Sequence, residues 1–356
     1  MNYVSLTMAV FAMLGALDRI FGNRFGLGGQ FEKGFHLFGS MALSMIGMIL
    51  ISPVIADILK PAAEWMYRAL RIDPSVIPAV LFANDMGGAP LAKELAENES
   101  VGMFNALVVS SMMGCTISFT IPVSLEIVKP ENHRFTLLGY LCGIVTIPIG
   151  CFVSGLICRI PVGMLLWDLL PLVLFSVLIA CGLLFCPNVC VKIFQVFGKG
   201  MKILITAGLA LGIWRFLTGM EILPGIDLLE NGAAVCLNAA VVMSGAFPLM
   251  HLVSKALTKP LKAMGKRLSI NETSAMGFVA SLATSMTTYE MMNDMDDKGL
   301  TLNAAFAISA AFTFAGHLAF TMAFDAAYIF PVIAGKLTAG FTSLLAAAFV
   351  YRRNAK

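Results

Sequence analysis

Long apolar runs alternate with short polar connections along the whole chain. A transmembrane helix needs roughly 20 predominantly apolar residues, and nine runs reach about that length. These runs are residues 3–21, 35–59, 101–128, 135–158, 164–186, 200–218, 232–257, 300–324 and 327–351. Two further stretches, 75–97 and 273–293, begin apolar but are then interrupted by polar residues. We therefore expect nine transmembrane helices plus two broken segments. The broken segments either re-enter the membrane as hairpins or cross it, which would raise the number of spans to ten or eleven.

The composition agrees with this pattern. Hydrophobic residues make up 58% of the 356 residues and charged residues only 13%, whereas soluble domains carry about 25% charged residues. We therefore predict an all-α polytopic membrane protein with the lipid bilayer as its solvent. The formal net charge of +3 is too small to indicate a nucleic-acid partner. None of the eight cysteines forms a C-x-x-C pair, so we expect buried apolar thiols, with no metal site and no cofactor.

The two halves of the chain contain an internal repeat. The sequence LFANDM at 81–86 corresponds to SLATSM at 281–286, and each lies inside one of the broken segments. Other matching pairs are Asn105 with Asn303, Ser111 with Ser309, and Lys60-Pro61 with Lys259-Pro260. We predict a first repeat at 1–160, a linking transmembrane helix at 161–190 and a second, inverted repeat at 191–356, each repeat holding four spans and one broken segment.

Charge predicts the orientation. Connections on the cytoplasmic side of a membrane carry an excess of Lys and Arg, and the basic regions are 19–33, 192–202, 255–267 and the C-terminus. The loop at 220–231 holds three acidic residues and no Lys or Arg, so we expect it outside. All four basic regions fall on one side only if both broken segments are re-entrant. We therefore prefer re-entrant hairpins, with the C-terminus in the cytoplasm. The sequence AAEWMYRAL at 62–70 is typical of an amphipathic helix at the membrane interface.

The first broken segment carries the main candidate site. A carboxylate at the bilayer centre costs roughly 2.5–3.5 kcal/mol, so Asp85, next to Asn84, needs a cation, a proton or backbone N–H groups as compensation. Gly87 and Gly88 permit a tight reversal of the chain here. The matching position of the second repeat is Ser285, beside Thr284. We predict that these four polar residues bind substrate. The alternatives are that Asp85 caps the short helix that follows it and that Thr284 and Ser285 only form a polar turn.

Further polar residues on or near the spans are candidates for the same site. They are Asn105, Thr116, Asn303, His317, Gln30 and Glu32. Small polar side chains also join transmembrane helices by hydrogen bonds, and a histidine in an apolar run is more often a packing residue than a ligand. Gln30 and Glu32 either guard an entrance or cap a helix. These alternatives stay open on the sequence alone.

Four motifs give the chain a family resemblance. GGQFEKGF, NDMGG, VTIPIGC and FPVIAGKL resemble the EutH family of bacterial ethanolamine-utilisation membrane proteins nearly end to end. The resemblance implies an ethanolamine permease or facilitator of the inner membrane. A homodimer is common for architectures with two such repeats, and the sequence leaves the oligomeric state open. Two positions depart from the family pattern. The second tip reads Thr284-Ser285-Met286-Thr287 where the family carries an asparagine pair and a proline, and Gly316 precedes His317 where the family often has an acid.

Other functions are weighed against this one. A cation-coupled secondary transporter for another small amine or metabolite has the same architecture. A carrier for a small carboxylate would need Arg, Lys or free N–H groups at the tips, and neither tip has Arg or Lys. An enzyme is disfavoured because no HExxH or G-x-S-x-G motif is found. An ATP-driven pump is not supported because no GxxxxGK[ST] motif is found. A receptor or scaffold would not need two broken segments inside the membrane.

Overall fold

The computed structural model describes residues 3–354, apart from the side chains of residues 261, 262, 264 and 354, and within this range it contains helices and no strands. The helices in the first half are α1 (Tyr3–Ile20), α2 (Leu27–Leu70), α3 (Val76–Leu81), η1 (Asn84–Met86), α4 (Gly88–Leu95), α5 (Glu99–Phe104), η2 (Asn105–Gly114), η3 (Thr116–Thr120), α6 (Ile121–Ile127), η4 (Pro130–Asn132) and α7 (His133–Ile157). The remaining helices are α8 (Val162–Phe185), α9 (Pro187–Thr218), α10 (Leu229–Leu268), α11 (Glu272–Ala283), α12 (Ser285–Met291), η5 (Met292–Asp294), α13 (Asp297–Ala310), α14 (Gly316–Phe324), η6 (Ala326–Tyr328) and α15 (Ile329–Asn354).

In the described residues, eight helical stretches are long and apolar enough to cross a membrane. Many of their large apolar side chains are exposed on the outside of the molecule, including Leu174 and Phe349, which fits contact with lipid. The stretch Glu99–Ile127 is different, because 89% of its apolar 18-residue window is buried inside the protein. It lies at the centre of the bundle, and its middle part is wound as π-helix in η2 and η3, a geometry that is frequent at functional sites.

The predicted span at 300–324 is wrong as a continuous helix. It is split into α13 and α14 by a turn at 311–315, where Phe312 takes a positive φ of 61°. The backbone N–H of Phe312 donates to the Ser281 carbonyl at 2.9 Å, and that of Phe314 donates to the Leu282 carbonyl at 2.9 Å. Because α11 accepts these hydrogen bonds, the broken backbone is satisfied inside the protein, the condition under which irregular backbone is tolerated at membrane depth.

The two interrupted segments are each two short helices joined by a sharp break. In the first, α3 packs against α4, and in the second, α11 packs against α12. The first break is closed by the Ala83 carbonyl, which accepts hydrogen bonds from the N–H groups of Met86 at 3.0 Å and Gly88 at 2.8 Å. Gly87 has a φ of 100°, and a Cβ there would lie 1.9 Å from the Cγ of Met48. Only glycine fits this turn, because it needs both the positive φ and the missing side chain.

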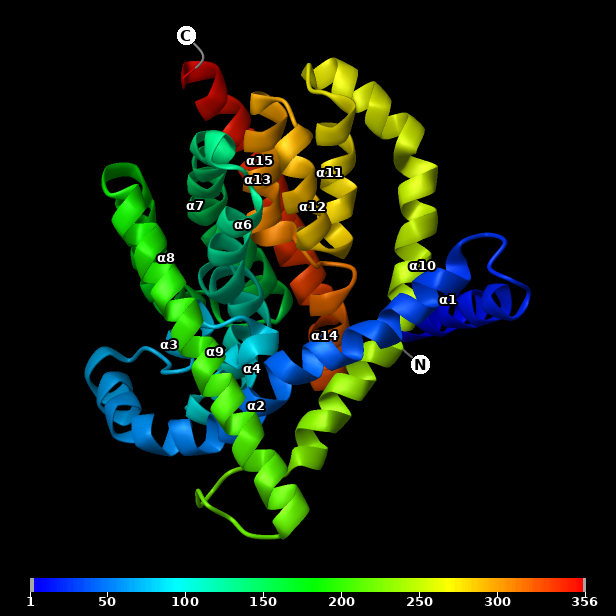
Figure 1. Ribbon diagram of the computed structural model, residues 1–356. Coiled ribbons are helices and arrows are strands. Elements are labelled where there is room, and N and C mark those ends of the chain that lie inside the picture. Colours follow the sequence, from blue (N-terminus) through cyan, green and yellow to red (C-terminus); the bar gives the residue numbers. More distant parts are fainter. Residues whose placement is uncertain (1–2, 355–356) are drawn as a thin grey trace.

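Two long helices bend around this core. Pro53 and Pro61 lie inside α2, and Pro248 and Pro260 lie inside α10. In Figure 1 the end of α10 and the C-terminus of the chain lie together at the top, whereas the connection between α9 and α10 lies at the bottom. The regions predicted as basic loops are largely helical: α2 begins at Leu27, and residues 192–202 and 255–267 belong to α9 and α10. The helices continue through these regions because lysine has a high helix propensity.

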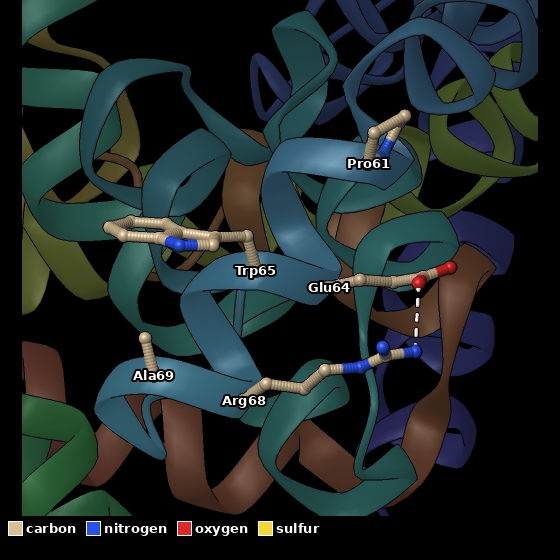
Figure 2. A pocket seen from close by; sticks show the side chains of 5 residues that line it. All are labelled: Pro61, Glu64, Trp65, Arg68 and Ala69. Atoms are coloured by element: carbon tan, nitrogen blue, oxygen red, sulfur yellow. Dashed lines mark hydrogen bonds and ion pairs between the residues drawn. The ribbon is translucent and has the colours of Figure 1, made fainter.

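The end of α2 forms an exposed amphipathic helix, in agreement with the interfacial helix expected at 62–70. Figure 2 shows Glu64 and Arg68 on one side of this helix, with their ion pair of 3.1 Å, and Trp65 pointing away from them. The Trp65 side chain is 67% exposed. The shallow pocket drawn there is lined by residues of α2 alone. Because tryptophan is enriched at the boundary between lipid and water, this surface fits a membrane interface better than a binding site.

Candidate functional site

A cavity of about 430 Å³ lies where the two interrupted segments approach the centre of the molecule. Its walls come from α2, from η1, from the end of the π-helical stretch, from α10, and from the breaks before α12 and α14. The wall is mostly methionine and phenylalanine. These apolar residues are Leu37, Met41, Met45, Met86, Phe119, Met243, Phe247, Ala283, Met286, Phe312, Gly316 and Phe320. An apolar pocket with a few polar groups is the usual form of a small-molecule site.

Three of the predicted site residues line this cavity. Asp85 comes from η1, Thr284 from the break before α12, and His317 from the first turn of α14. The structure therefore brings the two interrupted segments to one cavity. Asp85 is partly exposed and takes part in none of the ion pairs found among the described residues. Its carboxyl group is a hydrogen-bond acceptor at the cavity wall.

Asn84 and Ser285 are buried directly beside these residues and do not line the cavity. Neither the Oδ1 nor the Nδ2 of Asn84 has a hydrogen-bond partner within the described part of the chain. A buried amide without hydrogen-bond partners is costly, so packing alone does not account for Asn84. Ser285 lies beside the hydroxyl of Tyr289 on α12.

The candidates on the central spans serve helix packing in this structure. Thr116 donates to the Met112 carbonyl at 2.7 Å and to the Ile308 carbonyl at 3.2 Å, which joins the π-helical stretch to α13. Asn303 donates to the carbonyls of Ser274 and Gly299, both at 2.8 Å. The bonds to Ile308 and Ser274 join different helices, as small polar residues do in membranes, whereas those to Met112 and Gly299 lie within one helical stretch.

Asn105 lies in a second buried polar cluster, away from the cavity. Its Nδ2 donates to Ser75 Oγ at 3.0 Å and to Asp168 Oδ1 at 3.2 Å. Ser75 Oγ in turn donates to Asp73 at 2.5 Å. Asp168 is only 3% exposed, and the sequence reasoning had not singled it out. The cluster ties α8 to α3 and to the central span.

Gln30 and Glu32 lie near the start of α2 and are not among the residues that line the cavity. Glu32 accepts a hydrogen bond from Arg19 Nε at 2.6 Å in an exposed ion pair. Glu32 is therefore held on the surface by the end of α1. Arg19 pairs with Glu32 and not with its neighbour Asp18. The Asp18 carboxylate instead accepts hydrogen bonds from the backbone N–H groups of Phe25, Leu27 and Gly28.

One functional candidate was missed by the sequence reasoning altogether. Lys336 on α15 is 1% exposed and lies inside the molecule, next to the cavity residue His317. Its electrostatic neighbours include Asp85 and Cys115, which both line the cavity. A lysine in the middle of an apolar run is itself a signal, because a charge buried in a membrane helix is usually functional.

The comparisons with known proteins agree with this architecture. The family described as "Ethanolamine utilisation protein, EutH" matches residues 1–350. The chain belongs to the EutH family. Similar proteins are the "Probable ethanolamine permease EutH" of Listeria monocytogenes, 45% identical over 98% of this chain and 94% of that protein, and the one of Salmonella typhimurium, 40% identical over 95% and 92%. The "Uncharacterized protein YxeR" of Bacillus subtilis is 38% identical over 98% of this chain and 94% of that protein. No solved structure matches.

Two of the EutH motifs that carried the resemblance lie at the cavity or beside it. NDMGG forms η1 and the glycine turn, and FPVIAGKL is the part of α15 that holds Lys336. Gly316, one of the two departures in the sequence, lines the cavity next to His317. The other departure, at Thr284 to Thr287, forms the break and first turn of α12. The sequence differences therefore fall on the second half of the same site.

Proposed function

We propose that this EutH-family protein carries protonated ethanolamine across the bacterial inner membrane. The observation that supports this most directly is Asp85, a carboxylate without an ion-pair partner among the described residues, in an otherwise apolar cavity inside a bundle of membrane-spanning helices. By analogy with lysine, the amine of ethanolamine has a pKa of roughly 10 and is charged at neutral pH. The cation cannot readily cross lipid, so a protein route matters when the external pH is low.

The cavity supplies a partner for each end of this substrate. The ammonium group would donate to the Asp85 carboxylate, and the rings of Phe119 or Phe312 would stabilise its charge from the side. Thr284, His317 and the serines Ser40 and Ser44 are polar lining groups that could meet the hydroxyl end. Four heavy atoms fill roughly 100 Å³ at the volume of about 30 Å³ per water, so the cavity leaves room for part of the hydration shell.

Related halves support a carrier that exposes one site to alternate sides. In the first half the Asp73 carboxylate accepts the backbone N–H of Asn98 at 2.9 Å. In the second half the Asp296 carboxylate accepts the backbone N–H of Asn271 at 2.8 Å. Asp73 of the first half matches Asn271 of the second, and Asn98 matches Asp296. The aspartate and the asparagine are therefore exchanged between the halves, but in both a carboxylate accepts the backbone N–H of the matching asparagine. In our proposal the two halves are inverted, the interrupted segments are re-entrant, and the C-terminus is cytoplasmic.

The test is uptake of labelled ethanolamine into proteoliposomes at pH 6, with empty liposomes as the baseline. At this pH only about one molecule in ten thousand is uncharged, so leakage through lipid is small. We expect saturable uptake that unlabelled ethanolamine and ethylamine inhibit and that ethylene glycol, which lacks the charge, does not. Uptake no faster than in empty liposomes would refute the proposal. Replacing Na⁺ by K⁺ and collapsing the proton gradient would then show whether transport is coupled.

A further inference from the structure

The strongest feature outside the proposed contacts is the buried lysine behind the cavity. Lys336 Nζ lies 2.8 Å from the Ser111 carbonyl and 3.1 Å from His317 Nδ1. It forms no ion pair with a carboxylate within the described residues. Its charged or titratable neighbours are Asp85 from η1, Cys115 from the π-helical stretch, Cys151 from α7 and His317 from α14. Lys336 itself does not line the cavity.

The contacts of Lys336 determine the protonation state of His317. An ammonium group has three donors and no acceptor, so the nitrogen that faces it, Nδ1, must be an acceptor and carry no proton. The proton of the neutral imidazole is then on Nε2. A second positive charge on the ring is disfavoured because Lys336 is only 3.1 Å away. Nε2 has no hydrogen-bond partner among the described residues, and His317 lines the cavity.

We propose that Lys336 is a positioning residue that holds His317 neutral with its Nε2–H donor available to the cavity, and that this donor recognises the hydroxyl oxygen of the substrate. The inference rests on the proposed function for the identity of the substrate. It divides the work of the site: Asp85 binds the ammonium end, and the His317–Lys336 pair selects amines that carry a hydrogen-bond acceptor at the other end. A hydroxyl can accept this bond, and the methyl group of ethylamine cannot.

The first measurement is the state of the His317 ring. The chain has four histidines, so ¹⁵N-histidine labelling gives few signals, and the His317→Gln variant assigns the one of interest. Long-range ¹H–¹⁵N correlation at pH 7 in nanodiscs distinguishes Nε2–H, Nδ1–H and the imidazolium. We expect Nε2–H in the wild type and loss of this pure state in Lys336→Met. Nδ1–H or an imidazolium in the wild type would overturn the proposal, whether or not the variants fold.

The second measurement is selectivity. We expect ethanolamine to compete roughly tenfold better than ethylamine in the wild type, the value of about one hydrogen bond. In Lys336→Met this ratio should fall to about one. The loss of the Lys336 charge also changes the attraction between Asp85 and an ammonium group. This change is the same for ethanolamine and ethylamine, so it does not alter the ratio of their affinities. Lys336→Arg keeps a cationic donor and should keep both the ratio and the Nε2–H signal if it folds.

The outcomes separate this inference from the proposed function. If neither amine binds the wild type but the ring is Nε2–H, the transport proposal fails and the state of His317 assigned from Lys336 stands. If ethanolamine binds and the ratio is the same in Lys336→Met, the transport proposal stands and the role of Lys336 is refuted.

Discussion

Replacing Asp85 by asparagine tests the central contact of the site. The change removes one charge and keeps the shape of the side chain. Losing one partner of a buried charge pair costs about 2–5 kcal/mol. Asp85 is partly exposed to a cavity of about 430 Å³, so solvent in the cavity weakens the pair and places the cost near the lower end. About 2–3 kcal/mol corresponds to a loss of ethanolamine affinity of roughly 30- to 150-fold.

The assay is ethanolamine binding to the purified protein in nanodiscs, together with the midpoint of thermal unfolding. Asp85→Asn should not lower the midpoint, because the carboxylate has no ion-pair partner among the described residues to lose. The matched control is Asp57→Asn, which removes an acid that is exposed, paired with Lys60 at 2.6 Å and absent from the cavity wall. The control should change affinity by less than twofold.

Two results would refute the reasoning. The first is a loss of less than threefold in affinity for a folded Asp85→Asn variant, which would mean that the ammonium group does not meet this carboxylate. The second is an equal loss in Asp57→Asn, which would mean that the effect comes from the general charge of the protein. If Asp85→Asn kept its affinity for ethanolamine but lost uptake, Asp85 would act in a translocation step and not in binding.

Three further outcomes follow from the structure. Gly87→Ala should destabilise the protein by about 1–3 kcal/mol, because the new Cβ would meet Met48 at 1.9 Å at a φ of 100°; Gly163→Ala, with no atom within 4 Å, should leave the unfolding midpoint nearly unchanged. Asn105→Ala should cost about 1–3 kcal/mol of stability without changing ethanolamine selectivity, since it leaves buried Asp168 without its hydrogen-bond donor; unchanged unfolding would contradict this. A fluorescent reporter fused to the C-terminus should fold in the cytoplasm, and a periplasmic reporter at the same end should be inactive; the reverse pattern would invalidate the orientation.

Hydropathy alone predicted most of the membrane helices, because span length and apolar character are local properties of the sequence. The exception at 300–324 shows the limit of this approach. Its central sequence contains no proline and no charge, yet the helix breaks at Phe312. What stabilises the break is a pair of hydrogen bonds to the carbonyls of Ser281 and Leu282 on α11. These contacts join residues that are about thirty positions apart in the sequence, and no periodicity of the span itself reveals them.

The candidate site divides in the same way. Asp85 was predicted as a site residue because an acid inside an apolar membrane segment is energetically costly. The same argument applies to Lys336 and Asp168, but each is a single charge inside a long apolar run, so the hydropathy pattern assigns it to a span without marking it as a site residue. The methionine and phenylalanine wall could not be predicted, because those residue types are equally common in packed cores. Asn303 and Thr116 had the expected chemistry, but their partners are backbone carbonyls in the helix contacts.

The charges around the cavity explain which cations fit it. Asp85 and Lys336 carry opposite charges and interact electrostatically, but they lie on different elements, and only Asp85 reaches the cavity wall. In the proposed site, a substrate ammonium pairs with the Asp85 carboxylate, and His317, with the Lys336 cation behind it, adds positive potential to another part of the wall. A molecule that is cationic at one end and a neutral acceptor at the other matches this gradient. In this proposed arrangement a diamine would place its second ammonium near Lys336, where repulsion and the Nε2–H donor both oppose it, so we expect the site to exclude a diamine of nearly the same size as ethanolamine.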